Sequence, residues 1–212
     1  MRILLIRHGR QNSPLCNVNV PLAEEGRRQA ELLGQRLKNE RIDAIWSSDL
    51  LRAVETADIV NRYLHVPREI RADLKEISFG DMEGLSDSVI ADKYEDFLRA
   101  RAKMEKDMAY PGGESAHDVA ERVLPVIKEI SERDYDTVAV VTHGGVIRSM
   151  VACFLGMDLA KVPLLAGHLE NCGITEIRVR KNDGRVILNR FNDAAHLEVC
   201  PELLRSGWRG KQ

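Results

Sequence analysis

Two short aliphatic runs, one near each end of the chain, lead directly into a histidine followed by glycine. Residues 3–6 precede Arg7-His8-Gly9, and residues 138–141 precede Thr142-His143-Gly144. Short runs of branched aliphatic residues bounded by glycine are typical of buried strands. In open α/β sheets, ligands bind at the carboxyl ends of the strands. We therefore predict that both histidines lie at strand ends and build one site from distant parts of the sequence.

Strand-like and helix-like segments alternate along the chain. This order is typical of a mostly parallel sheet with helices on both faces. The sequence therefore predicts an α/β fold, a three-layer α/β/α sandwich with a mostly parallel central sheet. We expect a C-terminal β-hairpin and a short helical insertion, about residues 80–112, over the active site.

Local signals give the element boundaries. Apolar residues at helical spacing predict a helix around 22–39, and residues 47–49 offer capping oxygens to a helix that runs to about 63. Ser115 and Asp118 resemble a capping box for a helix over 115–132. The other predicted elements are strands 2–7, 44–46, 68–71 and 137–142, helices near 86–104 and 145–155, and a hairpin of 174–179 and 186–191 with Asn182-Asp183-Gly184 in its turn.

Size and charge limit the classes of protein to consider. With 212 residues, 44% of them hydrophobic, the chain is expected to form one domain spanning 1–212. Its apolar runs are too short to cross a bilayer, and a net charge of -2 gives no general attraction to nucleic acid or anionic membranes. We therefore expect neither partner, and a monomer or a homodimer.

The cysteines and the first residues of the chain indicate the cellular compartment of the protein. The cysteines show no paired spacing for zinc, and we expect no disulfides among Cys16, Cys153, Cys172 and Cys200. The chain starts directly with a strand and shows no basic and apolar leader. We therefore predict a reducing, cytoplasmic location.

Four separate segments offer groups suited to phosphate chemistry: Arg7-His8-Gly9, Arg52, Glu76 and His143-Gly144. An arginine binds two phosphate oxygens at once, and a glycine before a helix start lets backbone N–H groups approach an anion. A neutral imidazole can attack phosphorus, and a nearby carboxyl group can act as a general acid. Arg52 falls in the first turn of its helix, where a cation opposes the helix dipole unless an anion binds there.

Each residue also has an ordinary structural explanation. Arg52 could pair with Glu55 or Asp49 on the surface. Glu76 could be solvated, and His143 could be a turn residue that bonds a nearby carbonyl. The prediction of a site depends on the occurrence of these residues together, at strand ends and in this order.

The segments RHG, SSDLLRAVETA, LKEISFGDMEG, PGGES and VVTHGGVIR resemble, in this order, the motifs of the histidine phosphatase superfamily, also called the phosphoglycerate mutase-like family. The resemblance covers nearly the whole chain and implies a three-layer α/β/α fold with a covalent phosphohistidine mechanism. It implies that His8 is the nucleophile and that Glu76 protonates the leaving oxygen, then deprotonates the attacking water. The groups implied to hold the phosphoryl group are those of Arg7, Arg52, His143 and Gly144. Neither a metal nor another cofactor is expected.

The segment after Arg7-His8-Gly9 departs from the family. Many relatives carry an asparagine there that contacts phosphate, and in this chain Pro14 stands at about that position. The residues that could contact the substrate instead are Arg10, Gln11, Asn12 and Asn17.

The resemblance predicts hydrolysis of small phosphate monoesters. The sequences of the motifs are most similar to those of α-ribazole phosphatase-type and broad-specificity phosphatases. One alternative is a phosphoglycerate mutase, but such mutases carry a longer insertion that shields the phosphoenzyme from water, whereas only residues 85–110 are inserted here. The other alternative is a non-catalytic regulator that binds a phosphorylated ligand, which the joint presence of both histidines and Glu76 disfavours.

The sequence does not identify the substrate. The insertion carries charges of both signs, typical of a solvated helix, although an apolar wall could form from Tyr94, Phe97, Met104 and Met108. The nearly neutral charge balance argues mildly against a polyanionic substrate. The remaining histidines are expected to be structural: His65, His117, His168 and His196. Of these, His168 is the one placed to approach the site from the side. The sequence assigns no role to residues 192–212.

Overall fold

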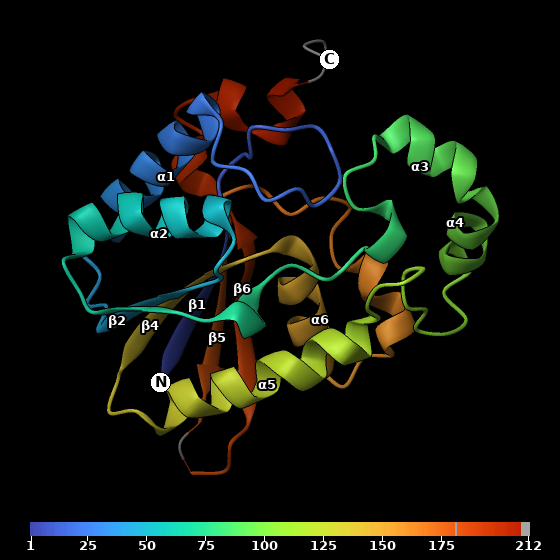
Figure 1. Ribbon diagram of the computed structural model, residues 1–212. Helices are drawn as coiled ribbons and strands as arrows, with labels where there is room; N and C mark the ends of the chain where they lie inside the picture. Colours follow the sequence, from blue (N-terminus) through green and yellow to red (C-terminus); the bar gives the residue numbers. More distant parts are fainter. Residues whose placement is uncertain (181, 209–212) are drawn as a thin grey trace.

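The computed structural model describes residues 1–180 and 182–208. Within these residues, the central sheet has six strands in the order β3-β2-β4-β1-β5-β6 (Figure 1). The strands are β1 (Arg2–Arg7), β2 (Ala44–Ser47), β3 (Arg68–Ile70), β4 (Thr137–Thr142), β5 (Ile174–Val179) and β6 (Val186–Asp193). β3, β2, β4 and β1 run parallel, whereas β5 pairs antiparallel with both β1 and β6. The predicted mostly parallel sheet and C-terminal hairpin are confirmed.

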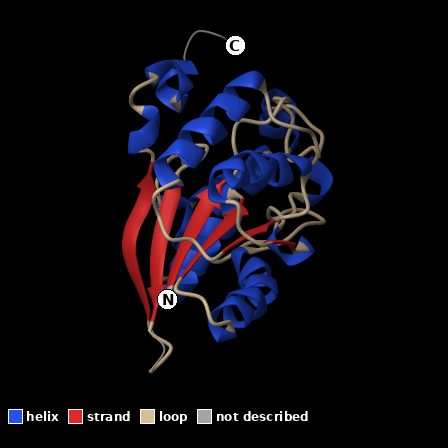
Figure 2. Ribbon diagram, turned by 90° about the vertical axis from the view of Figure 1, so that its left-hand side faces the viewer, coloured by secondary structure: helices blue, strands red, loops and turns tan. Residues whose placement is uncertain are grey.

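Helices cover both faces of the sheet, which gives the three predicted layers (Figures 1 and 2). On one face lie α1 (Glu24–Leu37) and α2 (Leu51–Leu64). On the other face lie α5 (Ala116–Glu132) and α6 (Gly144–Phe154).

The side chains of β1 alternate between the two faces of the sheet and so contribute to two hydrophobic clusters. Leu4 and Ile6 pack with residues of α1 and α2, whereas Ile3 and Leu5 pack with residues of α5 and α6. All four side chains are buried. The carboxyl end of the central strand is therefore held from both sides, which fixes the position of the residues that follow it.

Three helices have nearly the predicted bounds, namely α1, α5 and α6. The capping box of α5 is confirmed: Ser115 Oγ accepts a hydrogen bond from the Asp118 N–H at 3.2 Å, and Asp118 Oδ2 accepts one from the Ser115 N–H at 2.8 Å. The turn of the hairpin contains Gly184 with φ of 69°, as a tight turn requires. Residue 181 of this turn lies outside the described residues.

The start of α2 differs from the prediction. Leu50, rather than residues 47–49, is the residue before its first turn, and no side chain of its own caps the helix. Asn19 supplies the cap instead, because its Oδ1 accepts a hydrogen bond of 2.8 Å from the Leu51 N–H. Ser48 Oγ accepts from the Leu50 N–H at 3.2 Å, one residue before the helix, and also lies 2.9 Å from His143 Nε2.

The insertion contains two short helices instead of the single helix expected near 86–104. α3 (Asp87–Lys93) and α4 (Glu95–Ala102) meet at Tyr94, whose φ of -118° and ψ of 25° interrupt the helix. The Tyr94 hydroxyl donates a 3.1 Å hydrogen bond to the Asp81 carbonyl, which anchors this break. Neither helix contains a buried residue, as the mixed charges predict.

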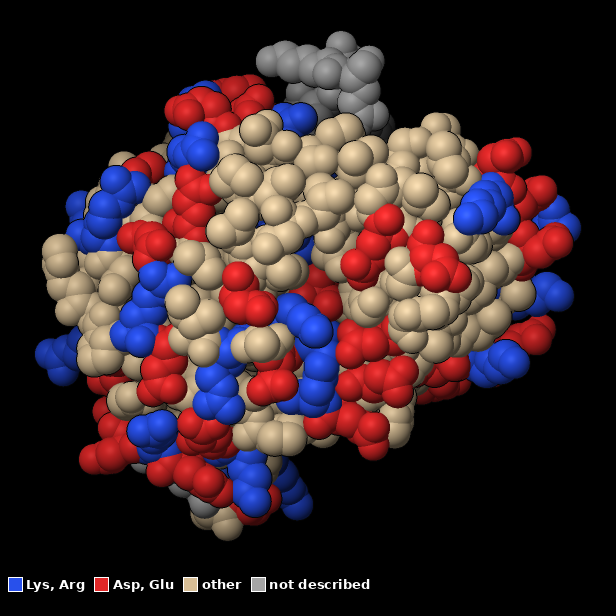
Figure 3. Space-filling view, viewed as in Figure 1, with Lys and Arg blue, Asp and Glu red and all other residues tan. Residues whose placement is uncertain are grey.

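Charges of both signs are interspersed over the face shown in Figure 3. Ion pairs account for many of them, for example Arg71 with Glu129 and Arg62 with Glu31, each at 2.6 Å. In the part of the chain that is described, no helix combines the length and apolar character needed to span a membrane.

Candidate active site

His8 and His143 lie side by side at the carboxyl end of the sheet. β1 and β4 are adjacent and parallel, and Arg7 is paired with Thr142, so the next residues of both strands face each other. Their ring centroids are 5.0 Å apart. His8 is 4% exposed and His143 is fully buried. The structure thus brings the two ends of the sequence into one buried site.

The hydrogen bonds of His8 define which ring nitrogen carries its proton. Nδ1 lies 2.7 Å from the Gly9 carbonyl oxygen, which can only accept, so Nδ1 carries the hydrogen. Nε2 then presents a lone pair, and the Arg52 Nε–H donates to it at 3.3 Å. Burial, together with the charges of Arg52 and Arg7, lowers the pKa of His8 well below its usual range. The imidazole is therefore neutral near pH 7, with Nε2 available as a nucleophile.

The Arg52 guanidinium is buried, and its hydrogen-bond partners are uncharged. Nη1 donates to the Val18 carbonyl at 2.9 Å and Nη2 donates to Asn17 Oδ1 at 2.7 Å. Glu55, a possible partner from the sequence, is instead bonded to Arg27 at 2.6 Å. Burial lowers the pKa of Arg52. A buried cation in the first turn of α2, held by neutral groups, is suited to bind an anion.

Two buried side-chain nitrogens near His8, Nδ1 of His143 and Nε of Arg7, have no hydrogen-bond partner among the described residues. Buried polar groups are normally paired, so these atoms mark a place for an acceptor such as a phosphate oxygen. Ser48 Oγ lies 2.9 Å from His143 Nε2 and accepts from the Leu50 N–H at 3.2 Å, so its hydroxyl hydrogen can point to Nε2. That arrangement leaves a hydrogen on His143 Nδ1.

Burial shifts the pKa values of both residues. Burial, followed by the neighbouring His8, lowers the pKa of His143 well below its usual range. Burial also lowers the pKa of Arg7 to about 10, so this guanidinium stays charged near neutral pH. The Arg7 side chain is held in place by a hydrogen bond from Nη1 to the Leu169 carbonyl.

Glu76 reaches the site from the loop that follows β3. Its Oε1 accepts hydrogen bonds from the N–H groups of Ile77 and Gly145, each at 2.9 Å. Thr142 Oγ1 donates to the Leu74 carbonyl at 2.7 Å, which ties this loop to the end of β4. One carboxylate oxygen is thus fixed at the start of α6, while the carboxyl group itself lines a cavity.

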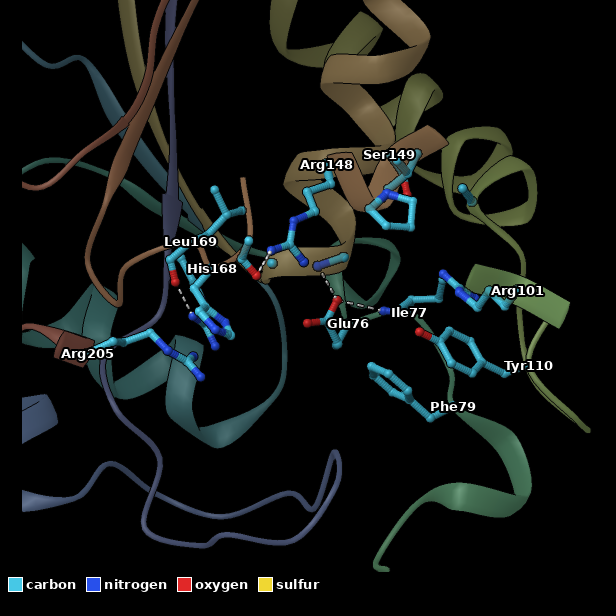
Figure 4. Close-up of a pocket in the computed structure, with 17 residues that line it drawn as sticks. Glu76, Ile77, Phe79, Arg101, Tyr110, Arg148, Ser149, His168, Leu169 and Arg205 are labelled. Atoms are coloured by element: carbon cyan, nitrogen blue, oxygen red, sulfur yellow. Dashed lines mark hydrogen bonds between the residues drawn. The ribbon is translucent and has the colours of Figure 1, made fainter. Parts of the chain in front are cut away.

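The cavity has a volume of about 380 Å³ and opens beside Glu76 (Figure 4). Aromatic and cationic residues lie on different sides of it. Phe79, Arg101 and Tyr110 form one side, and Arg148, His168 and Arg205 form the other. The rings of Phe79 and Tyr110 have centroids 4.6 Å apart, and the Arg101 guanidinium lies 4.2 Å from the Tyr110 centroid. The aromatic wall therefore comes from Phe79, just before the insertion, and Tyr110, near its end, rather than from the four residues considered in the sequence.

Asn17 joins the site through Arg52, and it also donates from Nδ2 to Glu83 Oε1 at 3.0 Å. It is the one of the four candidate residues after Arg7-His8-Gly9 that the structure brings to these side chains. Its Glu83 partner belongs to the start of the insertion, so the two loops are joined there.

The other three candidates are placed elsewhere. Arg10 forms an ion pair with Glu25 of α1 at 3.3 Å. The Gln11 side chain donates to two carbonyls of its own loop, those of Ser13 and Leu15. Asn12 is exposed.

Sequence reasoning missed several groups around the site. Buried Asn171 donates from Nδ2 to the His8 carbonyl at 2.8 Å, although nothing in its spacing links it to His8. Arg148 could have been found, because it follows Gly144 by one helical turn and so projects from the same end of α6. His168 does line the cavity, whereas its neighbour there, Arg205, had no signal in the sequence.

The donor set suits an anion better than a divalent metal. Of the residues lining the cavity that are described, four are arginines and one, Glu76, is a carboxylate. Divalent metals prefer several carboxylate, imidazole or thiolate ligands. Over residues 1–180 and 182–208, the one cluster of three such side chains is His117, Asp118 and Glu121, all exposed on α5.

Comparison with known proteins shows the family of this chain. The sequence pattern of the histidine phosphatase superfamily (branch 1) matches residues 3–193. The metal-independent phosphoserine phosphatase of Arabidopsis thaliana is 33% identical over 212 residues, which cover 96% of this chain and 86% of the relative. The structure of mycobacterial glucosyl-3-phosphoglycerate phosphatase has a TM-score of 0.82 and 27% identity, covering 91% of this chain and 98% of that one. The α-ribazole phosphatase from Shigella flexneri has a TM-score of 0.77 and 26% identity, covering 92% and 97%. With two histidines at adjacent strand ends and a family pattern that spans nearly its whole length, this chain belongs to the histidine phosphatase superfamily.

Proposed function

We propose that the chain is a metal-independent phosphatase that hydrolyses small phosphate monoesters through a covalent phosphohistidine on His8. One observation carries the proposal: the Gly9 carbonyl holds the proton of His8 on Nδ1, so Nε2 faces Arg52 with its lone pair. The similarity to a phosphoserine phosphatase, a glucosyl-3-phosphoglycerate phosphatase and an α-ribazole phosphatase supports the reaction class.

The phosphate binds among Arg7, Arg52, His143 and the first N–H of α6. The His8 Nε2 attacks phosphorus while the ester oxygen leaves, so one P–N bond forms and one P–O bond breaks. Glu76, in its carboxylic acid form, gives its proton to the leaving oxygen. The arginines stabilise the negative charge on the transferred phosphoryl group, which is the task that metal ions perform in other phosphatases.

The second half returns the protein to its starting state. A water molecule attacks phosphorus, and the Glu76 carboxylate accepts the proton of that water. The P–N bond breaks, inorganic phosphate leaves, and His8 recovers its lone pair. The insertion is short, and a short insertion favours attack by water on the phosphohistidine over transfer to a second substrate.

The direct test is rapid-quench trapping of a phosphoenzyme. With p-nitrophenyl phosphate near pH 6, we expect turnover that EDTA does not affect and that vanadate inhibits. An acid-labile phosphohistidine should form, and His8→Ala should abolish both it and turnover. His117→Gln is the matched control, because His117 is exposed on α5.

Three results would contradict the proposal. Turnover at the wild-type rate in His8→Ala would remove His8 as the nucleophile. Transfer of the phosphoryl group to a second phosphorylated compound in preference to water would indicate a mutase. Binding of phosphate without any turnover would indicate a regulator.

A further inference from the structure

An arginine of α5 holds the loop that carries Glu76. Arg122 Nη2 donates to the Glu76 carbonyl at 3.2 Å, and Nη1 donates to the Asp73 carbonyl at 2.5 Å. Nε and Nη2 of the same side chain donate to the two carboxylate oxygens of Glu114, at 2.7 and 2.9 Å. All three guanidinium nitrogens therefore have partners, and this fork fixes the position of the loop relative to α5.

Glu114 holds the next part of the same loop. Its Oε2 accepts a hydrogen bond of 2.8 Å from the Ser78 N–H, and its own N–H donates to the Ser78 carbonyl at 2.9 Å. Burial opposes the ionisation of Glu114, but the hydrogen bonds from Arg122 and from the Ser78 N–H outweigh it and lower its pKa. Glu114 is therefore ionised near neutral pH, and its charge pairs with that of Arg122.

The pair rests on a rigid part of the fold and lies outside the cavity. On α5, Arg122 is flanked by Val119, one turn before it, and by Val123, and both valines are buried in the core. Glu114 immediately precedes Ser115, which caps that helix. Neither Arg122 nor Glu114 is among the described residues that line the cavity. The contacts of the pair with the site therefore run through the loop that it holds.

Glu76 is thus fixed at two points, its main chain and one carboxylate oxygen. Arg122 holds the main chain, while Oε1 accepts from the N–H groups of Ile77 and Gly145 (Figure 4). Leu74 and Ile77 are buried, which keeps the loop on the protein, but burial has no preferred direction, whereas hydrogen bonds do. A displacement of about 1 Å can cost a catalytic group about a hundredfold in rate. The direction in which the Glu76 carboxyl group points therefore depends on the hydrogen bonds of Arg122.

We propose that Arg122, paired with Glu114, is a positioning residue that holds the Glu76 carboxyl group within reach of the ester oxygen. This role rests on the proposed phosphatase function, because it concerns the general acid of that reaction. Loss of the pair should slow proton transfer to the leaving oxygen and leave phosphate binding unchanged. An ion pair that only stabilises the fold would contribute to the free energy of unfolding and affect neither.

Phosphoenzyme formation in a single turnover with glycerol 3-phosphate measures this role. Arg122→Gln should slow this step about ten- to a hundredfold, as the displacement of a catalytic group does. The inhibition constant for vanadate should not change, because none of the described hydrogen bonds of Arg122 goes to a group that would hold the phosphate. Phosphoenzyme formation from p-nitrophenyl phosphate should slow less, since p-nitrophenol leaves without much help from an acid.

Arg36→Gln is the matched control. Arg36 and Asp193 form an ion pair in which each side chain is 23% exposed, against 16% and 22% for Arg122 and Glu114. The Arg36 side chain bonds to Asp193 and His196, which are not part of the Glu76 loop. This variant should lose stability without slowing phosphoenzyme formation.

Arg122→Lys separates position from charge. Burial is the main cause that lowers the pKa of His143, and the Arg122 charge adds to it, so a loss of this charge also reaches the site. Lysine keeps the charge but lacks the planar fork that binds Glu114 and two carbonyls at once. The rate should therefore recover only in part. Full recovery would show that charge rather than position matters and would overturn the proposal.

A double-mutant cycle shows whether Arg122 acts through Glu76. In a chain that already carries Glu76→Gln the acidic proton is absent, so Arg122→Gln should cause little further loss. Losses that multiply in full would mean that the two residues act independently and would refute the proposal, as would a wild-type rate in a folded Arg122→Gln variant. If Arg122→Gln does not fold, Glu114→Gln takes its place with the same expectations, because its amide replaces an acceptor of Arg122 by an NH₂ group.

The amide proton of Gly145 separates this role from the proposed function. It is donated to Glu76 Oε1 at 2.9 Å, so its chemical shift reports the position of the carboxyl group without any turnover. Suppose that no phosphoenzyme forms in the wild type, but that Arg122→Gln moves this shift in the same direction as Glu76→Ala while Arg36→Gln does not. The proposed function then fails and the positioning of Glu76 by Arg122 stands. An unchanged shift in Arg122→Gln would refute the positioning role whether or not the phosphoenzyme forms.

Discussion

The side-chain oxygen of Asn17 accepts a hydrogen bond of 2.7 Å from Nη2 of Arg52. Asn17 has φ of 46°, a left-handed conformation that asparagine tolerates better than most residues. It stands three positions after Pro14, at about which we expected a phosphate-contacting asparagine from the family resemblance. The loop after Arg7-His8-Gly9 therefore acts on the site through the orientation of a guanidinium.

Loss of this contact is expected to weaken anion binding. Asn17→Gly keeps the backbone conformation and removes the acceptor, so the Arg52 guanidinium loses one of the hydrogen bonds that hold it in place. One hydrogen bond to a charged group in a partly exposed place stabilises by about 1–1.5 kcal/mol, which corresponds to an inhibition constant for vanadate about 5–13-fold higher. Asn12→Gly, at an exposed position of the same loop, is the control and should leave the constant unchanged. Equal inhibition constants in Asn17→Gly and wild type would contradict the role of Asn17.

Glu76→Gln should slow the release of an alkyl alcohol more than the release of p-nitrophenol. The amide oxygen of glutamine can still accept from the N–H groups of Ile77 and Gly145, so the geometry is kept while the acidic proton is lost. General acid catalysis contributes about 10²–10⁴-fold, and an alkyl alcohol needs the proton more than p-nitrophenol does. We expect phosphoenzyme formation to slow far more with glycerol 3-phosphate than with p-nitrophenyl phosphate. Stopped-flow measurement of a p-nitrophenolate burst checks this, and equal slowing with both substrates would exclude Glu76 as the general acid.

Alanine substitutions at two neighbouring glycines, Gly144 and Gly145, test whether the position of the Glu76 carboxylate limits turnover. A Cβ at residue 145 would lie 2.6 Å from Glu76 Oε1 and 2.6 Å from Ile77 Cγ2, whereas a Cβ at residue 144 would meet only the Arg7 side chain, at 3.7 Å from Nε and 3.9 Å from Cδ. Gly145→Ala must therefore displace the carboxylate, and we expect its kcat to fall about tenfold or more below that of Gly144→Ala. Steady-state kinetics of both variants provide the measurement. A larger loss of kcat in Gly144→Ala would show that the placement of Glu76 is not what limits turnover.

Local sequence signals were sufficient for most of the fold. Aliphatic runs predicted the strands that carry His8 and His143, and Ser115 with Asp118 predicted the start of α5 because both partners of that cap lie within one turn. The start of α2 was missed because its cap comes from Asn19, more than a helix length away in the sequence. The break at Tyr94 was missed, and the hydrogen bond from its hydroxyl to the Asp81 carbonyl is a tertiary contact with no local signal in the sequence.

The residues of the candidate site also divide into those that local sequence signals identify and those that only tertiary contacts reveal. Residues next to strand ends or helix starts, such as His8 and His143, could be found from position alone. Asn171 and Arg205 could not, since the fold brings them in from segments with no motif of their own. What the sequence lacks is the tertiary contact that turns such a residue inward, for example the burial of Leu203 that fixes the backbone before Arg205.

The last prediction concerns stability in acid and depends on His196. Arg36 Nη1 donates to its Nδ1 at 3.2 Å, and burial followed by the Arg36 charge lowers the pKa of His196 from 6.5 to about 4. Above pH 6.5 the imidazole is neutral in both the folded and the unfolded chain. Between pH 6.5 and 4 the unfolded chain takes up a proton that the folded chain does not, so the free energy of unfolding falls as the pH falls.

We therefore expect the free energy of unfolding to decrease between about pH 7 and about pH 5, and His196→Gln to reduce that decrease because glutamine does not titrate. His8 and His143, whose pKa values are also lowered, should account for part of the remainder. Urea unfolding at the two pH values provides the measurement, with His117→Gln, an exposed site on α5, as the control that should keep the wild-type dependence. If His196→Gln lost as much stability in acid as wild type, the protonation of His196 would not be linked to unfolding, and the acid sensitivity would come from other groups, among them His8, His143 and His168, whose pKa values are also lowered.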